Sequence, residues 1–120
     1  MSSESSESVF EPVELRAPSG ARVMEIEWSD GVTTRHPHAL LRGFCPCAHC
    51  QGHQGPIEWA GDLEGSALEI GAIEEVGNYA VRIAWGDGHS TGIYTWQHLR
   101  ALGAIGDLPI DEARRSRFGR

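Results

Sequence analysis

The sequence predicts a small α+β domain, made mainly of antiparallel strands, in which a strand-turn-strand-helix unit is used twice. Three observations support this class. Apolar and polar side chains alternate over residues 23–28 and 79–85, which is typical of half-buried strands. Each of these segments is followed by Asp-Gly, a pair that favours a hairpin turn because glycine readily adopts positive φ. A short apolar, helix-compatible segment follows each return strand, and the first one leads into a cysteine-rich loop.

The first unit begins with a strand over Val23–Trp28, whose residues on one face are Met24, Ile26 and Trp28. We expect a turn at Ser29-Asp30-Gly31 and a return strand from Thr33. Pro37 suits the first turn of a short helix through Leu41, because its fixed φ and missing N–H cost nothing there. Gly43 is expected to end this helix and to open the cysteine loop.

The second unit begins with a strand over Tyr79–Trp85, whose predicted buried face consists of Tyr79, Val81, Ile83 and Trp85. A turn at residues 86–89 and a return strand over residues 91–94 follow. Thr95 can cap a helix over residues 96–102, and Gly103 can close it. Another strand, over residues 68–76 and interrupted at Gly71, is expected before this unit.

The two units share a sequence pattern. In the first, Ile-x-Trp-x-Asp-Gly ends at Gly31 and leads to Leu41-Arg42. In the second, the same pattern ends at Gly88 and leads to Leu99-Arg100. Asp30 and Asp87 could be catalytic or metal-binding, but we expect them to accept hydrogen bonds from turn amides.

The domain is predicted to cover residues 12–108. Residues 1–11 form a Ser/Glu-rich leader with little to bury, which we expect to be disordered. Residues 51–66 contain four glycines and read as a long irregular connection. Residues 109–120 form a polar, basic tail that we expect to be frayed.

Charge and hydropathy exclude several function classes. The net charge is −7, and only six of the ten arginines lie in the first 113 residues, with all seventeen acidic residues. Such a body repels a phosphate backbone, so we expect no nucleic-acid partner. There is no apolar run of membrane-spanning length and no secretory signal, so we expect a cytoplasmic protein without a membrane partner.

Three cysteines form the pattern Cys45-x-Cys47-x2-Cys50. Gly43 and Pro46 predict a loop here, and thiols so close together can converge on one metal ion. Redox-active thiols and incidental cysteines are the alternatives. A tetrahedral site needs a fourth ligand, and the residues alone leave open His89, a water, or another histidine. The other histidines are His36, His38, His49, His53 and His98, the last of which is expected to be a surface or partly packed residue on a helix.

Four segments in order resemble the gamma-butyrobetaine hydroxylase-like N-terminal domain over about residues 13–103. They are Ile26–Gly31, Leu41–Arg42 with Cys45–Cys50, Val76–Val81, and Trp85–Trp96. The resemblance implies one zinc ion bound by Cys45, Cys47, Cys50 and His89, as in the domain that precedes the catalytic part of those hydroxylases. The oxygenase activity belongs to that catalytic part and is not carried over.

The function we expect is therefore a non-catalytic module with a structural zinc that acts through protein partners. Related domains occur fused to ATPases of iron–sulfur cluster assembly, which supports an alternative role in handling iron or an iron–sulfur cluster. A thiol redox protein or enzyme, with one of the same cysteines as nucleophile, is a further alternative. Nothing in the sequence demands a particular oligomeric state.

Overall fold

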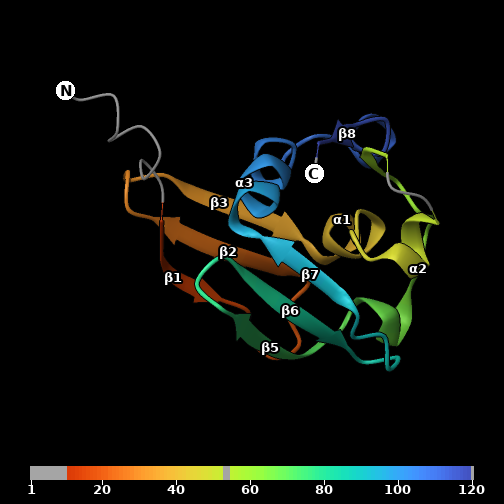
Figure 1. The fold of residues 1–120 in the computed structure, drawn as a ribbon, viewed down its shortest axis with the longest axis horizontal. Helices are drawn as coiled ribbons and strands as arrows, with labels where there is room; N and C mark the ends of the chain where they lie inside the picture. The colour runs from red at the N-terminus through yellow and green to blue at the C-terminus, as the bar shows by residue number, and fades with distance from the viewer. Residues whose placement is uncertain (1–10, 53–54, 120) are drawn as a thin grey trace.

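The computed structural model describes residues 11–52 and 55–119 and contains two three-stranded antiparallel sheets (Figure 1). The first sheet has the order β1-β2-β3, with bounds Pro12–Arg16, Val23–Trp28 and Thr33–Pro37. The second has the order β5-β6-β7, with bounds Ile70–Val76, Ala80–Trp85 and Gly92–Thr95. Helix α1 (His38–Gly43) follows the first hairpin and α3 (Trp96–Ala104) follows the second. The predicted α+β class with two strand-turn-strand-helix units is confirmed.

The alternating side chains form the common core as predicted, with one exception. Met24, Ile26 and Trp28 of β2 are buried, and so are Val81, Ile83 and Trp85 of β6. Tyr79 was expected on the same face but is 53% exposed, because it belongs to the turn before β6. The strand begins at Ala80, which is buried on the opposite face.

The two Asp-Gly turns have matching hydrogen bonds. The Trp28 N–H donates to the carbonyl of Val32 at 2.8 Å, and the Trp85 N–H donates to the carbonyl of His89 at 2.8 Å. The glycine of each turn adopts positive φ, 88° at Gly31 and 95° at Gly88. The predicted hairpins are therefore confirmed, and each fixes the register of its strands.

The helices begin close to where the sequence predicts. Pro37, expected in the first turn of α1, is its N-cap and the last residue of β3, and the Thr95 hydroxyl accepts the His98 N–H at 3.1 Å at the start of α3. Helix α3 continues through Gly103 to Ala104 instead of closing at Gly103. A Cβ at Gly103 would lie 2.5 Å from Cβ of Thr34, so this glycine allows α3 to pack closely on β3.

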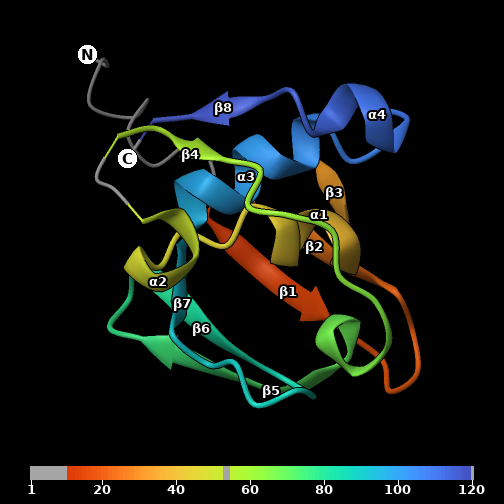
Figure 2. The same cartoon turned by 90° about the vertical axis from the view of Figure 1, so that its right-hand side faces the viewer.

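The C-terminal segment folds back onto the domain, so the expectation of a frayed tail after Pro109 is wrong. Helix α4 (Ile110–Ala113) is followed by β8 (Arg117–Phe118), which pairs with β4 (Ile57–Glu58) beside α3 (Figure 2). Ala113 is fully buried, and the Phe118 ring meets the Phe44 ring edge-on at 5.1 Å. The segment expected to be irregular, residues 51–66, contains β4 and the start of the 3-10 helix Gly65–Leu68.

The structure also bears on the predicted N-terminal leader and on the question of a membrane-spanning helix. The predicted disordered leader lies outside the described residues except for Glu11, whose N–H donates to the Ser29 hydroxyl at 3.0 Å. Strand β1, directly after it, pairs with β2 and was not predicted. No helix in the described chain has the length and apolar character needed to cross a bilayer.

Candidate metal site

Cys45 and Cys47 lie in the connection after α1, and Cys50 lies in the short helix α2 (Ala48–Gln51), which also carries His49. The expected loop is thus partly helical, because Cys47 takes the N-cap position and its sulfur accepts the Cys50 N–H at 3.3 Å. Cys45 is fully buried against the core, and Cys47 and Cys50 are half-buried. Phe44, also fully buried, anchors the segment that enters this turn.

His89 reaches the cysteines from the second Asp-Gly turn. Its N–H donates to Oδ1 of Asp87 at 3.2 Å, and the same carboxylate pairs with the Arg42 guanidinium at 3.0 and 3.1 Å. The hydrogen bonds from Arg42 keep the pKa of Asp87 below its ordinary value. Asp87 is therefore an ionised turn residue that orients His89, in agreement with the turn role expected for it.

The three sulfurs surround the His89 ring nitrogen. Nε2 of His89 lies 3.5 Å from Sγ of Cys45, 3.7 Å from Sγ of Cys47 and 3.4 Å from Sγ of Cys50. All four ligand atoms lie within 4.8 Å of one another. A tetrahedral zinc ion with Zn–S of about 2.3 Å and Zn–N of about 2.0–2.1 Å places sulfur about 3.6 Å from nitrogen. The group could therefore hold one metal ion.

Burial and neighbouring charge set the protonation of these groups when no metal is bound. Burial raises the pKa of Cys45 far above its ordinary value and also raises that of Cys50. Partial burial opposes ionisation of Cys47 too, but hydrogen bonds from Thr91 and from Cys50 lower its pKa. Burial and the nearby Arg42 lower the pKa of His89, so its imidazole is neutral at pH 7, the form that binds metals.

The other described histidines do not belong to the cysteine–histidine group. His36, His38 and His98 are buried outside the cysteine–histidine group, and each has a ring nitrogen within 3.0 Å of an oxygen, on Thr34, Leu68 and Phe44 respectively. The expectation that His98 is a surface or partly packed residue is wrong, because it is buried. His49 is exposed, and its ring centroid lies 6.3 Å from that of His89. His53 lies outside the described residues.

Two contacts that shape the site, made by Gly92 and Tyr94, were not predicted from the sequence. A Cβ at Gly92 would lie only 2.6 Å from Sγ of Cys45, so only glycine lets β7 pass this sulfur. A glycine inside a strand is a signal for such a close backbone approach. Tyr94, fully buried beside it, donates its hydroxyl hydrogen to the carbonyl of Leu41 at 2.7 Å and so ties β7 to α1.

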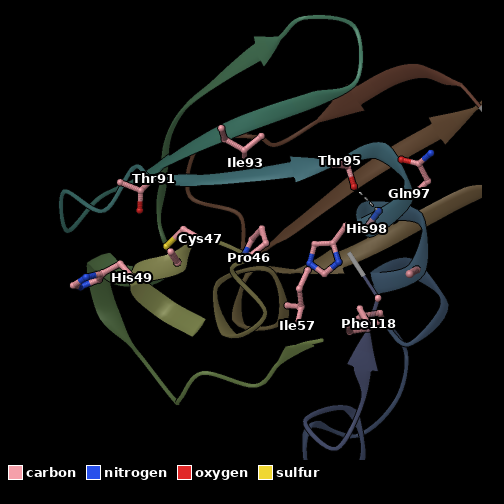
Figure 3. A pocket seen from close by; sticks show the side chains of 13 residues that line it. Pro46, Cys47, His49, Ile57, Thr91, Ile93, Thr95, Gln97, His98 and Phe118 are labelled. Atoms are coloured by element: carbon pink, nitrogen blue, oxygen red, sulfur yellow. Dashed lines mark hydrogen bonds between the residues drawn. The ribbon is translucent and has the colours of Figure 1, made fainter. Parts of the chain in front are cut away.

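An open groove of about 1060 Å³ runs beside the cysteines (Figure 3). One wall is formed by the cysteine segment and α2, with Pro46, Cys47 and His49. The opposite side is formed by α3, β4 and β8. Ile93 and Thr95 of β7, with Thr91 just before the strand, border the groove. Cys47 is thus shared between the cysteine–histidine group and the groove.

The fold and this group define a class: a small α+β domain with a Cys3His set that could hold a metal ion. Residues 15–100 match the family described as gamma-butyrobetaine hydroxylase-like, N-terminal. The chain belongs to this family, and the predicted resemblance is confirmed. No curated protein matches the chain.

Solved structures agree with this membership. One is a crystal structure of a protein of unknown function from the DUF971 family of Acidithiobacillus ferrooxidans, 38% identical, with a TM-score of 0.61. The match covers 78% of this chain and 93% of that one. An NMR structure is 31% identical with a TM-score of 0.64, over 88% of this chain and 76% of the other. A second NMR structure, 23% identical over 87% and 81% of the two chains with a TM-score of 0.63, shares the fold.

Proposed function

We propose that this protein is a non-catalytic module that binds one structural zinc ion through Cys45, Cys47, Cys50 and His89 and acts through protein partners. The observation that carries the proposal is the distance from Nε2 of His89 to each sulfur, 3.4 to 3.7 Å. These distances agree with the edge of about 3.6 Å in a tetrahedral zinc site. Four protein ligands fill such a site, which leaves no position for a reacting water.

The close spacing of the ligand atoms also favours a single ion over a cluster. In an iron–sulfur cluster the ligands are distributed over several irons, so the cluster separates them. Here all four atoms lie within 4.8 Å of one another around one point. The rival proposal is therefore one iron ion bound by the same four ligands. The identity of the bound metal distinguishes the zinc proposal from the iron proposal.

A structural role follows from where the ligands lie in the chain. Cys45 to Cys50 belong to the segment after α1, and His89 belongs to the turn between β6 and β7. A bound ion joins these two segments, which are 39 to 44 residues apart. Because the unfolded chain has no preformed site, the binding energy contributes to folding.

The test is elemental analysis and an absorbance spectrum of protein made without a tag, with zinc and iron both available. We expect about one equivalent of zinc and no visible absorbance, since zinc is d¹⁰. Cobalt substitution should then give the visible bands of a tetrahedral thiolate site. Cys47→Ser should lose metal and stability, and His49→Ala, which removes the neighbouring exposed imidazole, should lose neither. Absence of any metal from the wild-type protein would refute the site. Iron with visible absorbance would show that the site binds iron and not zinc.

A further inference from the structure

We infer that the groove beside the metal site binds an extended, uncharged segment of a partner polypeptide, which adds as a strand to the free edge of β7. This inference rests on the proposed function, because it names the surface through which the module meets its partner. Three features carry it: an unpaired strand edge, a described lining without Asp, Glu or Arg, and a groove wall that contains the metal ligand Cys47.

Strand β7 has an open edge at the groove. In the described part of the chain it pairs with β6 on one side and with no strand on the other. Its register places Tyr94 opposite Val81 and Ile93 opposite Arg82, and the Trp96 N–H donates to the carbonyl of Tyr79 at 3.2 Å. Because bonded pairs alternate in an antiparallel ladder, the N–H and C=O of Ile93 point away from β6. These groups are the ones to which an added strand would bond.

The groove has the lining that an apolar segment needs. Ile93, 36% exposed, borders it together with Ile57, Ala101 and Phe118 (Figure 3). None of the described lining residues is Asp, Glu or Arg, although 22% of the chain is charged and the net charge is −7. Burying a charge in such a groove is costly, so it fits uncharged side chains.

The shape of the groove favours a strand over a compact ligand. Its β7 side runs from Thr91 to Thr95, and the side chains of Thr91, Ile93 and Thr95 all line it. This span corresponds to about 13 Å of extended chain, the reach of a four- to five-residue strand. Side chains at alternate positions of the bound segment would then enter the apolar part of the groove.

One metal ligand, Cys47, connects the groove to the metal site. Cys47 lies in the wall formed by the cysteine segment, and Thr91, two residues beyond His89, lies on the border beside β7. The Thr91 hydroxyl also hydrogen-bonds to the sulfur of Cys47. A bound ion would fix the distance between the cysteine wall and the β7 border, so the partner segment should bind more weakly after the metal is removed.

The experiment is selection of displayed random dodecapeptides on the metal-loaded protein, followed by affinity measurement and NMR mapping with the enriched peptides. We expect uncharged peptides with alternating apolar residues and no internal proline, which shift the amide signals of residues 91–95. Ile93→Lys should weaken binding about tenfold, about 1.4 kcal/mol, because it puts a charge into the groove. Val13→Lys is the matched control: Val13 is 63% exposed on β1, an edge strand of the other sheet, and its replacement should leave binding unchanged.

Other outcomes overturn the inference. One is enrichment of peptides that are charged or rich in proline. Others are amide shifts outside residues 91–95 and peptide binding that Ile93→Lys leaves unchanged. A concentration-dependent dimer that Ile93→Lys abolishes would show that a second copy of the chain occupies the edge instead. Metal content is measured on each sample, so a protein without metal defeats the proposed function, whereas a metal-loaded protein that selects no peptide defeats only this inference.

Discussion

The guanidinium of Arg42 forms a bidentate ion pair with the carboxylate of Asp87, with N–O distances of 3.0 and 3.1 Å. Arg42 belongs to the helix of the first unit, and Asp87 belongs to the turn of the second. The reciprocal pair joins Arg100 of the second helix to Asp30 of the first turn at 2.7 Å. The repeated Leu-Arg pattern therefore has a structural reason: the arginine of each unit holds the turn of the other.

The turns are alike in their hydrogen bonds and differ in the side chain they present. Asp30 accepts the Val32 N–H at 3.3 Å, and Asp87 accepts the His89 N–H at 3.2 Å. Val32 is exposed, whereas His89 points its Nε2 at the three sulfurs. The same local scaffold thus places an apolar residue in one unit and a ligand-type residue in the other.

Arg42→Lys should reduce both the melting temperature and the metal affinity. Lysine cannot make the bidentate pair, so Asp87 loses one of the two hydrogen bonds that orient its carboxylate toward the His89 N–H. Outer partners of this kind typically change metal affinity by about tenfold or more. The measurements are thermal unfolding and competition with a chelator of known affinity.

The control for this prediction is Arg100→Lys, which breaks the equivalent pair on the turn without a metal ligand. It should lower the melting temperature and leave the metal affinity unchanged. Equal loss of affinity in both variants would contradict the role given to Arg42, because it would show a general effect of destabilisation.

Gly92→Ala should displace the sulfur of Cys45. The added Cβ would lie 2.6 Å from that sulfur and 3.1 Å from Cε1 of Tyr94, both of which are buried. Overpacking of this kind costs about 1–3 kcal/mol, and it should appear as weaker metal binding and a changed cobalt spectrum. Gly20→Ala is the control: Gly20 has φ of 82° with no atom near its added Cβ, so it adds strain without changing the spectrum. An unchanged cobalt spectrum in Gly92→Ala would count against the close fit.

Much of the fold could be predicted because it is encoded locally. Alternation over Val23–Trp28 gives a strand with those bounds, and the Asp-Gly pairs give both hairpins. Thr95 caps α3 because its hydroxyl accepts the amide three residues on. The convergence of Cys45, Cys47, Cys50 and His89 could be expected from the family resemblance, and from the residues alone the fourth partner stayed open.

What could not be predicted depends on contacts between distant segments. Strand β8 is two residues long and lies in a polar stretch, so it has no periodicity of its own and forms only by pairing with β4. Tyr79 fits the alternation of β6 but belongs to its turn. His98 lies on a helix whose sequence does not reveal that its buried side is covered by Phe118 at 5.3 Å.

Phe118→Ala should destabilise the protein by about 2 kcal/mol, somewhat less than for a fully buried phenylalanine, because the ring is half-buried. It removes edge-on contacts with the Phe44 and His98 rings at 5.1 and 5.3 Å. Urea unfolding provides the measurement, and Arg115→Ala, at an exposed position of the same segment, should have no effect. A frayed tail would make both variants neutral, so equal stabilities would contradict the packing of β8 onto the domain.

The buried His36 should make the protein less stable in mild acid. Burial, and secondarily the nearby His98, lower its pKa from 6.5 to about 4. Between these values the unfolded chain binds the proton more readily, so the free energy of unfolding should fall as the pH drops from 6.5 to about 4. The full effect corresponds to about 3 kcal/mol. Urea unfolding at a series of pH values gives the free energy of unfolding as a function of pH. This dependence should be shallower for His36→Gln, which can keep a polar contact to Thr34 without titrating. Because metal release in acid affects both proteins equally, the difference between the two slopes isolates His36, and parallel slopes would rule out this role.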